Sequence, residues 1–211
     1  MHLYLSDTRI ANCTYTTAEG QPLYEAKTKF SLSAGASKTT LTRNGTLVST
    51  ITWKKRGSPR IEFAGASEFK SKDFFNKGKH KGESVFRGPD GVEYKWIAAR
   101  KHPLELVRGG TFRDTQLVKF HPRRSRILHK SEPAYLEVLP EAPQILDTVL
   151  TTFIFLEYIR EEKRKRNEII EFELEFALDI LGGGDSGDSG GGTDGGGGGD
   201  GGGGGGGGGG S

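Results

Sequence analysis

The sequence predicts a mainly β protein: a closed or nearly closed antiparallel barrel of about twelve strands around a hydrophobic C-terminal central helix. Three observations lead to this prediction. Short segments of alternating apolar and polar residues follow one another over residues 1–139, and turn residues separate them. One later segment, residues 145–159, is apolar on nearly every side when it is placed on a helix.

The alternating segments are expected to be strands because successive side chains of a strand point to opposite faces of a sheet. Asn44-Gly45 is the strongest hairpin signal in the chain. Residues 69–75 are less regular, and 71–75 also fit one turn of helix. The expected strands are residues 3–5, 12–17, 23–30, 38–43, 47–54, 60–63, 82–87, 92–98, 103–108, 115–120, 125–128 and 134–139.

The apolar segment 145–159 is expected to be enclosed by protein, as part of a central helix over about residues 143–166. A helix of this length rises about 22 Å, whereas a bilayer core is about 30 Å thick. Asp147 and Glu157 also make lipid a poor environment for it. A barrel of more than about eight strands has an interior too wide for its own side chains to fill, and this helix would fill it. The alternative is a two-sheet sandwich with the helix covering an open end.

Three regions are expected along the chain of 211 residues: a barrel domain over 1–167, an acidic and apolar extension over 168–181, and a disordered glycine-rich tail over 182–211. Residues 169–181 fit both an amphipathic helix and a strand. The tail holds four of the 27 acidic residues and no basic one, so the remainder carries 30 basic and 23 acidic side chains, a formal charge of +7. That charge favours anionic partners or surfaces.

No catalytic, metal-binding or cofactor site is predicted. The single Cys13 excludes an intramolecular disulfide, suits a reducing compartment, and is interpreted as a buried structural thiol. The five histidines have no ligand spacing, and neither a phosphate-binding loop nor a nucleophile motif is present. The first residues do not form a secretory signal, so an intracellular location, cytoplasmic or nuclear, is expected. We therefore expect a binding module and not an enzyme.

Basic clusters are the main functional signal. The candidate residues for anion or lipid binding are Arg123, Arg124, Arg126, Lys130, Lys54, Lys55 and Arg56. Five further lysines, at positions 70, 72, 77, 79 and 81, surround His80. Loops at one end of a barrel would create a positive electrostatic field that attracts phosphate groups. The alternative is an ordinary solvated surface on which nearby acidic residues balance the basic ones.

A run at Lys163-Arg164-Lys165-Arg166 fits an import signal or a nucleic-acid patch. It fits equally the exposed end of the long helix, where Glu161 and Glu162 would pair with Lys165 and Arg166. We favour the second interpretation, so nucleic acid is not the expected partner.

The chain resembles domain-of-unknown-function family 6593, which occurs in mushroom-type fungi, over about residues 1–167. The most specific stretches are Gly88-Pro89-Asp90-Gly91 with Tyr94-Lys95-Trp96, and Pro133-Ala134-Tyr135-Leu136-Glu137. Residues 3–7, 20–24, 51–53 and 119–121 also match. The family is similar to tubby, LURP-one-related and scramblase proteins, which implies a barrel around a hydrophobic helix. Because tubby domains bind phosphoinositides, the resemblance also implies lipid binding, but no tubby ligand motif can be matched here.

Two functions are therefore expected from the sequence, and an enzyme remains as a distant third alternative. The first is binding to phosphoinositides or another anionic phospholipid surface through basic loops, as a peripheral membrane protein without a transmembrane segment. The alternative is a protein-interaction or scaffold domain that uses the apolar face of residues 169–181.

Overall fold

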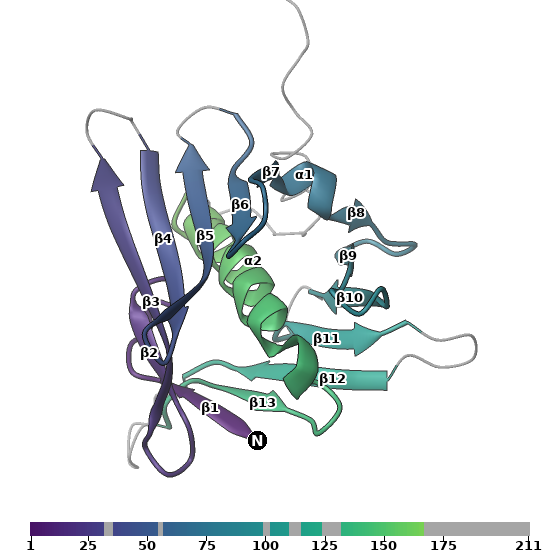
Figure 1. The fold of residues 1–211 in the computed structure, drawn as a ribbon. Coiled ribbons are helices and arrows are strands. Elements are labelled where there is room, and N and C mark those ends of the chain that lie inside the picture. The colour runs from purple at the N-terminus through teal and green to yellow at the C-terminus, as the bar shows by residue number, and fades with distance from the viewer. Residues whose placement is uncertain (32–35, 55–56, 99–101, 110–114, 124–131, 167–211) are drawn as a thin grey trace, which may run out of the picture.

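The computed structural model describes residues 1–31, 36–54, 57–98, 102–109, 115–123 and 132–166. These residues form one antiparallel sheet of 13 strands and one long C-terminal helix (Figure 1). The strands are β1 (His2–Leu5), β2 (Cys13–Thr16), β3 (Pro22–Ser31), β4 (Ala36–Arg43), β5 (Thr46–Lys54), β6 (Arg60–Phe63), β7 (Phe69–Lys70), β8 (Asn76–Lys77), β9 (Glu83–Arg87), β10 (Glu93–Ile97), β11 (Glu105–Arg108), β12 (Thr115–His121) and β13 (Tyr135–Val138). The mainly β prediction is confirmed.

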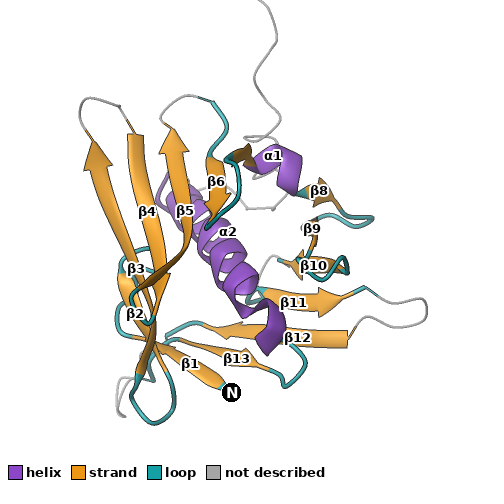
Figure 2. Cartoon of the chain, in the orientation of Figure 1, coloured by secondary structure: helices purple, strands orange, loops and turns teal. Residues whose placement is uncertain are grey.

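The order of strands in the sheet is β7-β6-β5-β4-β3-β2-β1-β13-β12-β11-β10-β9-β8. The sheet curves round, and the short helix α1 (Ser71–Phe74) connects its two outermost strands, β7 and β8 (Figure 2). Among the described residues, β7 and β8 are not hydrogen-bonded to each other. The sheet is therefore not closed by hydrogen bonds. This corrects the prediction of a fully closed barrel. We call the stretch 69–82, which crosses this opening, the seam.

Aromatic side chains pack across the seam. Phe74 stacks on Phe69 of β7 at 5.2 Å and on Phe86 of β9 at 5.5 Å between ring centroids. Phe75 is 3% exposed and stacks on Phe155 at 5.3 Å. The two sides of the opening are thus joined by apolar contacts, although no strand pairing joins them. Residues 71–75, which fitted one turn of helix in the sequence, supply the connection.

The turn η1 (Pro143–Ile145) leads into the helix α2 (Leu146–Arg166), which runs inside the curved sheet (Figure 1). Every residue from 148 to 157 is buried, which is nearly three helical turns. A helix buried on all sides in this way needs no polar face, which explains the apolar composition of its first half. The sheet is single, so the alternative two-sheet sandwich is not the fold.

Hydroxyl groups of α2 bond to side chains of the surrounding sheet. The Thr151 and Ser49 hydroxyls are 2.8 Å apart, and the Trp96 indole Nε1 donates to Thr152 Oγ1 at 2.9 Å. These bonds satisfy polar atoms that burial would otherwise leave unpaired. They also set the position of α2 relative to β5 and β10. The expected strand at 125–128, the extension 168–181 and the tail 182–211 lie outside the described residues.

Candidate anion-binding surface

The antiparallel order determines which strand ends lie together. Because every neighbouring pair is antiparallel, β1, β3, β5, β7, β8, β10 and β12 all end at the same edge of the sheet. We call this edge the rim. The α2 helix runs toward it: Asp147 near the start of α2 contacts Arg43 at the opposite edge, whereas Arg160 donates to the His102 carbonyl between β10 and β11 at the rim.

Basic side chains form a row along the rim. Lys29 of β3 is directly opposite Lys38 of β4, which is opposite Thr52 of β5. Thr52 is opposite Arg60 of β6, and Arg60 is opposite Lys70 of β7. Directly opposed residues point to the same face, and the spacing between strands makes the row about 19 Å long. We call Lys29, Lys38, Arg60 and Lys70 the basic row.

The basic row faces solvent. Lys29, Lys38 and Lys70 are exposed, and within the described part of the chain they form no ion pair. Arg60 contacts Glu68 at 2.6 Å. Like charges placed directly opposite each other on neighbouring strands destabilise a sheet. Lys29 and Lys38 are such a pair, so the stability of the sheet does not explain this arrangement.

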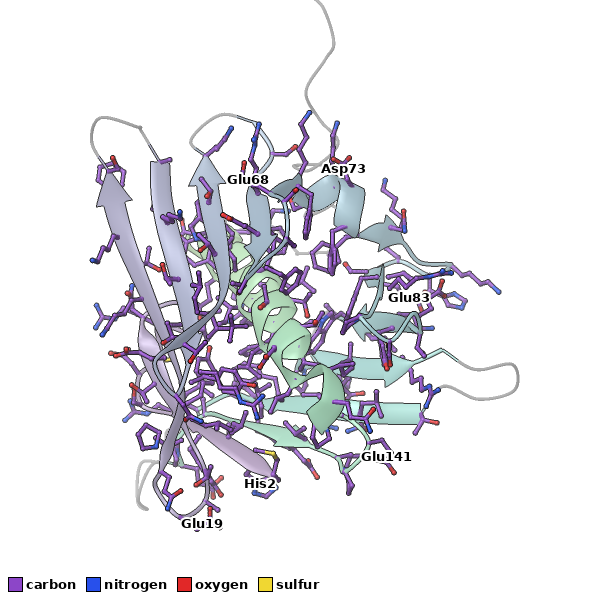
Figure 3. All side chains as sticks on the ribbon, in the orientation of Figure 1. His2, Glu19, Glu68, Asp73, Glu83 and Glu141 are labelled. Atoms are coloured by element: carbon purple, nitrogen blue, oxygen red, sulfur yellow. The ribbon has the colours of Figure 1, made fainter. Side chains whose placement is uncertain are left out.

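The seam continues the basic row. Lys70, Lys72, Lys77, Lys79 and Lys81 are all exposed, and Asp73 is the one acidic residue between positions 69 and 82. Figure 3 shows Asp73 and Glu68 beside α1, while Glu19 and Glu141 lie at the opposite side of the molecule. Five exposed lysines and one acidic residue give the seam a net positive charge.

A buried carboxylate holds the loop between β8 and β9. Glu83 is 6% exposed, accepts a hydrogen bond from the His80 amide at 3.0 Å and pairs with Lys95 at 3.1 Å. Burial acts to raise the pKa of Glu83, but the His80 amide and the Lys95 ammonium together lower it below its ordinary value. Gly78 packs so closely that a Cβ there would lie 2.4 Å from Glu83 Oε2. The loop is thus fixed while its lysines remain exposed.

Two of the residues predicted from the sequence lie in the described part of the chain. Lys54 is exposed at the end of β5, two residues beyond Thr52, which lies between Lys38 and Arg60 of the basic row. Arg123 follows β12, also at the rim, but β4, β3, β2, β1 and β13 separate β12 from β5 in the sheet. Lys55, Arg56, Arg124, Arg126 and Lys130 lie outside the described residues. The structure therefore brings Lys54 to the basic row and places Arg123 elsewhere on the rim.

Arg123 lines a pocket of about 190 Å³ together with Leu5, Asp7 and Ala134. Hydrogen bonds from Arg9 hold the pKa of Asp7 well below its usual range, so this carboxylate stays charged. A fixed negative charge in the lining opposes the binding of an anion. The pocket is consequently a weaker candidate than the basic row.

Lys29 and Lys38 were not identified from the sequence because they belong to no basic run. In the sequence, each is only a lysine at an outward-facing position near the end of a strand. That position indicates a binding surface only once the strand register shows that the two lysines are neighbours. The hairpin pairing that places Lys29 opposite Lys38 continues without a shift from Tyr24 opposite Arg43 to Ser31 opposite Ala36.

The described residues give no support for metal or thiol chemistry. No group of three or more His, Cys, Asp or Glu side chains within them could hold a metal ion. Cys13 is buried, its thiol donates to the Ile10 carbonyl at 3.4 Å, and burial raises its pKa to about 12. The interpretation of Cys13 as a buried structural thiol is confirmed.

The Cys13 thiol is expected to react with a disulfide reagent at pH 8 at least about a hundred-fold more slowly in the folded protein than in urea, because the thiolate is the reactive form. Absorbance at the wavelength of the released thiolate would measure both rates. Equal rates would contradict the burial of Cys13.

No helix in the described ranges is both long enough and apolar enough to cross a bilayer. The fold and the surface together define a mainly β protein in which one antiparallel sheet surrounds a C-terminal helix and carries a basic rim. The chain belongs to a family of unknown function (DUF6593), whose model matches residues 8–162. This confirms the family expected from the sequence. No curated protein and no solved structure matches the chain.

Proposed function

We propose that this protein is a binding module for anionic phospholipid surfaces and that it binds them through the basic row, with Lys54 and the seam lysines beside it. The observation that carries the proposal is the row itself: Lys29, Lys38, Arg60 and Lys70 are aligned in register across five strands. We further propose that the side-chain packing across the seam completes a tubby-like barrel, for which lipid binding is the expected function.

The magnitude of the charge supports this function. Each lysine or arginine near an anionic bilayer contributes about 1 kcal/mol of attraction, and the field extends about 8 Å at physiological ionic strength. The row, with Lys54 and Lys72, brings about six basic residues to one edge. Their summed attraction is sufficient for reversible binding without a buried pocket.

The composition of the row indicates which feature of the lipid it recognises. Lysine is a point charge on a flexible stem, whereas arginine forms a planar fork that matches a single phosphate. Three of the four residues in the row are lysines. The surface is thus suited to a layer of negative charge more than to one defined headgroup, and we expect phosphatidylserine and phosphoinositide vesicles both to bind.

Reversing the charge of the row should abolish binding. We expect the variant Lys29→Glu/Lys38→Glu to lose at least about thirty-fold in affinity for vesicles with 30 mol% phosphatidylserine, since roughly 1 kcal/mol is lost for each cation and repulsion is added. Co-sedimentation at about 0.15 M salt would measure it. The matched control is Arg87→Glu/Arg108→Glu, which changes the net charge equally on exposed residues of β9 and β11.

A third variant, with Arg123, Arg124 and Arg126 changed to Glu, tests the densest basic cluster predicted from the sequence. A large loss in this variant, with none in Lys29→Glu/Lys38→Glu, would move the site to that cluster. Equal pelleting of the wild-type protein with neutral and anionic vesicles would refute the proposed function.

A further inference from the structure

Phe30 is exposed at the rim. Its side chain is 67% exposed, the highest value among the large apolar residues that the structure describes as exposed, which are Met1, Phe30 and Leu47. Lys29 precedes it in β3, and Ser37 of β4 is directly opposite it. An exposed phenylalanine beside a row of cations combines the two features by which peripheral proteins bind membranes, apolar contact and charge.

The exposure of Phe30 follows from its distance across the sheet from the part that α2 covers. Phe30, Ser37 and Trp53 lie in one register row and therefore point to the same, inner face of the sheet. Trp53 is 6% exposed because Tyr158 of α2 stacks on it at 4.2 Å. Phe30 lies two strands further along this row and is left uncovered.

The other edge of β3 is also uncovered near Phe30. The pairing of β2 with β3 ends at Cys13 and Ala26, and beyond it the Thr28 amide donates to Asn12 Oδ1 at 2.7 Å. Beyond Thr28, β3 pairs with β4 alone. The end of β3 that carries Phe30 therefore has no neighbouring strand on the β2 side, which is the outer left edge of the sheet in Figure 1.

We infer that Phe30 is an apolar anchor that enters the interfacial region of an anionic bilayer while Lys29, Lys38 and Lys54 contact the headgroups around it. This inference rests on the proposed function and specifies its geometry: the rim meets the membrane, so that the outward-facing basic row and the inward-facing Phe30 both reach the headgroups. Lys29 and Lys38 point to one face of the hairpin and Phe30 to the other. A hairpin that enters end-on brings both faces into the headgroup layer at once.

Leu47 provides the natural comparison. It is 46% exposed and lies near the start of β5, at the edge opposite the rim. If any exposed apolar residue entered lipid, Leu47 and Phe30 would both enter the bilayer. If the membrane meets the rim, only Phe30 of these two residues enters it.

The test uses tryptophan as a probe of depth in the full-length protein. In Phe30→Trp, vesicles of phosphatidylcholine with 30 mol% phosphatidylserine should shift the added fluorescence to shorter wavelength, and brominated lipid should quench it. In Leu47→Trp neither change is expected. The two native tryptophans, Trp53 and Trp96, are buried, so the wild-type protein supplies a constant background.

An affinity measurement accompanies the probe. Phe30→Ser should weaken vesicle binding by about ten-fold at every salt concentration, because an apolar contact is not screened. The slope of affinity against salt concentration in Phe30→Ser should therefore equal that of the wild-type protein. Leu47→Ser should leave the affinity for vesicles unchanged.

The outcomes distinguish a failure of the Phe30 anchor from a failure of the proposed lipid-binding function. Binding of the wild-type protein without a shift or quenching in Phe30→Trp would overturn the anchor and leave the electrostatic function standing. Binding of the wild-type protein to neither phosphatidylserine nor phosphoinositide vesicles would overturn both. A response from Leu47→Trp equal to that of Phe30→Trp would show that the rim is not the surface that meets the lipid.

Discussion

Replacing Phe75 by alanine is expected to lower the free energy of unfolding by about 3–5 kcal/mol, the usual cost of removing a buried phenylalanine ring. Phe75 is 3% exposed and contacts Phe155 of α2 and Phe86 of β9 at centroid distances of 5.3 and 6.1 Å. It thus connects the seam, the central helix and the far side of the sheet. Within the described residues no strand pairing joins β7 to β8, so the seam depends on side-chain packing.

Chemical denaturation followed by far-ultraviolet circular dichroism would measure this loss. Phe30→Ala is the matched control, because it removes the same ring from a position that is 67% exposed. It should change the free energy of unfolding by less than about 0.5 kcal/mol. Phe75→Leu should fall between the two. If Phe75→Ala and Phe30→Ala were equally stable, packing across the seam would not hold the sheet together.

The second large effect is expected at Glu157, whose carboxylate is buried inside the sheet. Its side chain is 3% exposed and contacts Arg160 at 2.9 Å and Arg164 at 2.6 Å. Arg160 is itself largely buried, and burial lowers the pKa of its guanidinium. Removing one partner of a buried ion pair leaves an uncompensated charge. Glu157→Ala should therefore lower the free energy of unfolding by about 3–5 kcal/mol.

Arg164→Ala is the control for Glu157→Ala. The Arg164 side chain is 56% exposed, so water replaces much of its contribution and the expected loss is no more than about 1 kcal/mol. Urea denaturation at neutral pH would compare the two variants. A loss at Arg164 as large as the loss at Glu157 would mean that the network is stabilised mainly at its exposed end.

The central helix shows how far sequence reasoning extends. A segment with apolar residues on every side has to be enclosed, and Asp147 and Glu157 made lipid a poor environment for it. The structure places Asp147 at the edge of the sheet beside Arg43, and Glu157 inside it beside Arg160. Local composition was sufficient to predict that the helix is buried. It did not predict the ion pairs of Glu157, which form because Arg160 and Arg164 follow it by three and seven residues on the helix.

The candidate site was predicted only in part. Lys54 was identified because it begins a basic run, and the seam lysines were identified because they crowd one stretch. Lys29 and Lys38 were missed, since each is an ordinary lysine in a strand. The register between β3 and β4 makes them neighbours, and register is a property of pairing between segments. The same is true of Phe30, which lies on the inner face two strands beyond Trp53, the residue that Tyr158 of α2 covers.

By itself, the sequence determined the class of this protein: alternating strands, short turns, and an apolar helix that they have to enclose. Those features are local, because the period of side chains along one segment sets which faces need burial. Tertiary structure alone decided that the sheet stays unpaired between β7 and β8, that aromatic rings join its two sides, and that four basic residues align along one edge. These outcomes depend on which strands pair and in what register. Both the pairing and the register are determined jointly by residues that are far apart in the chain.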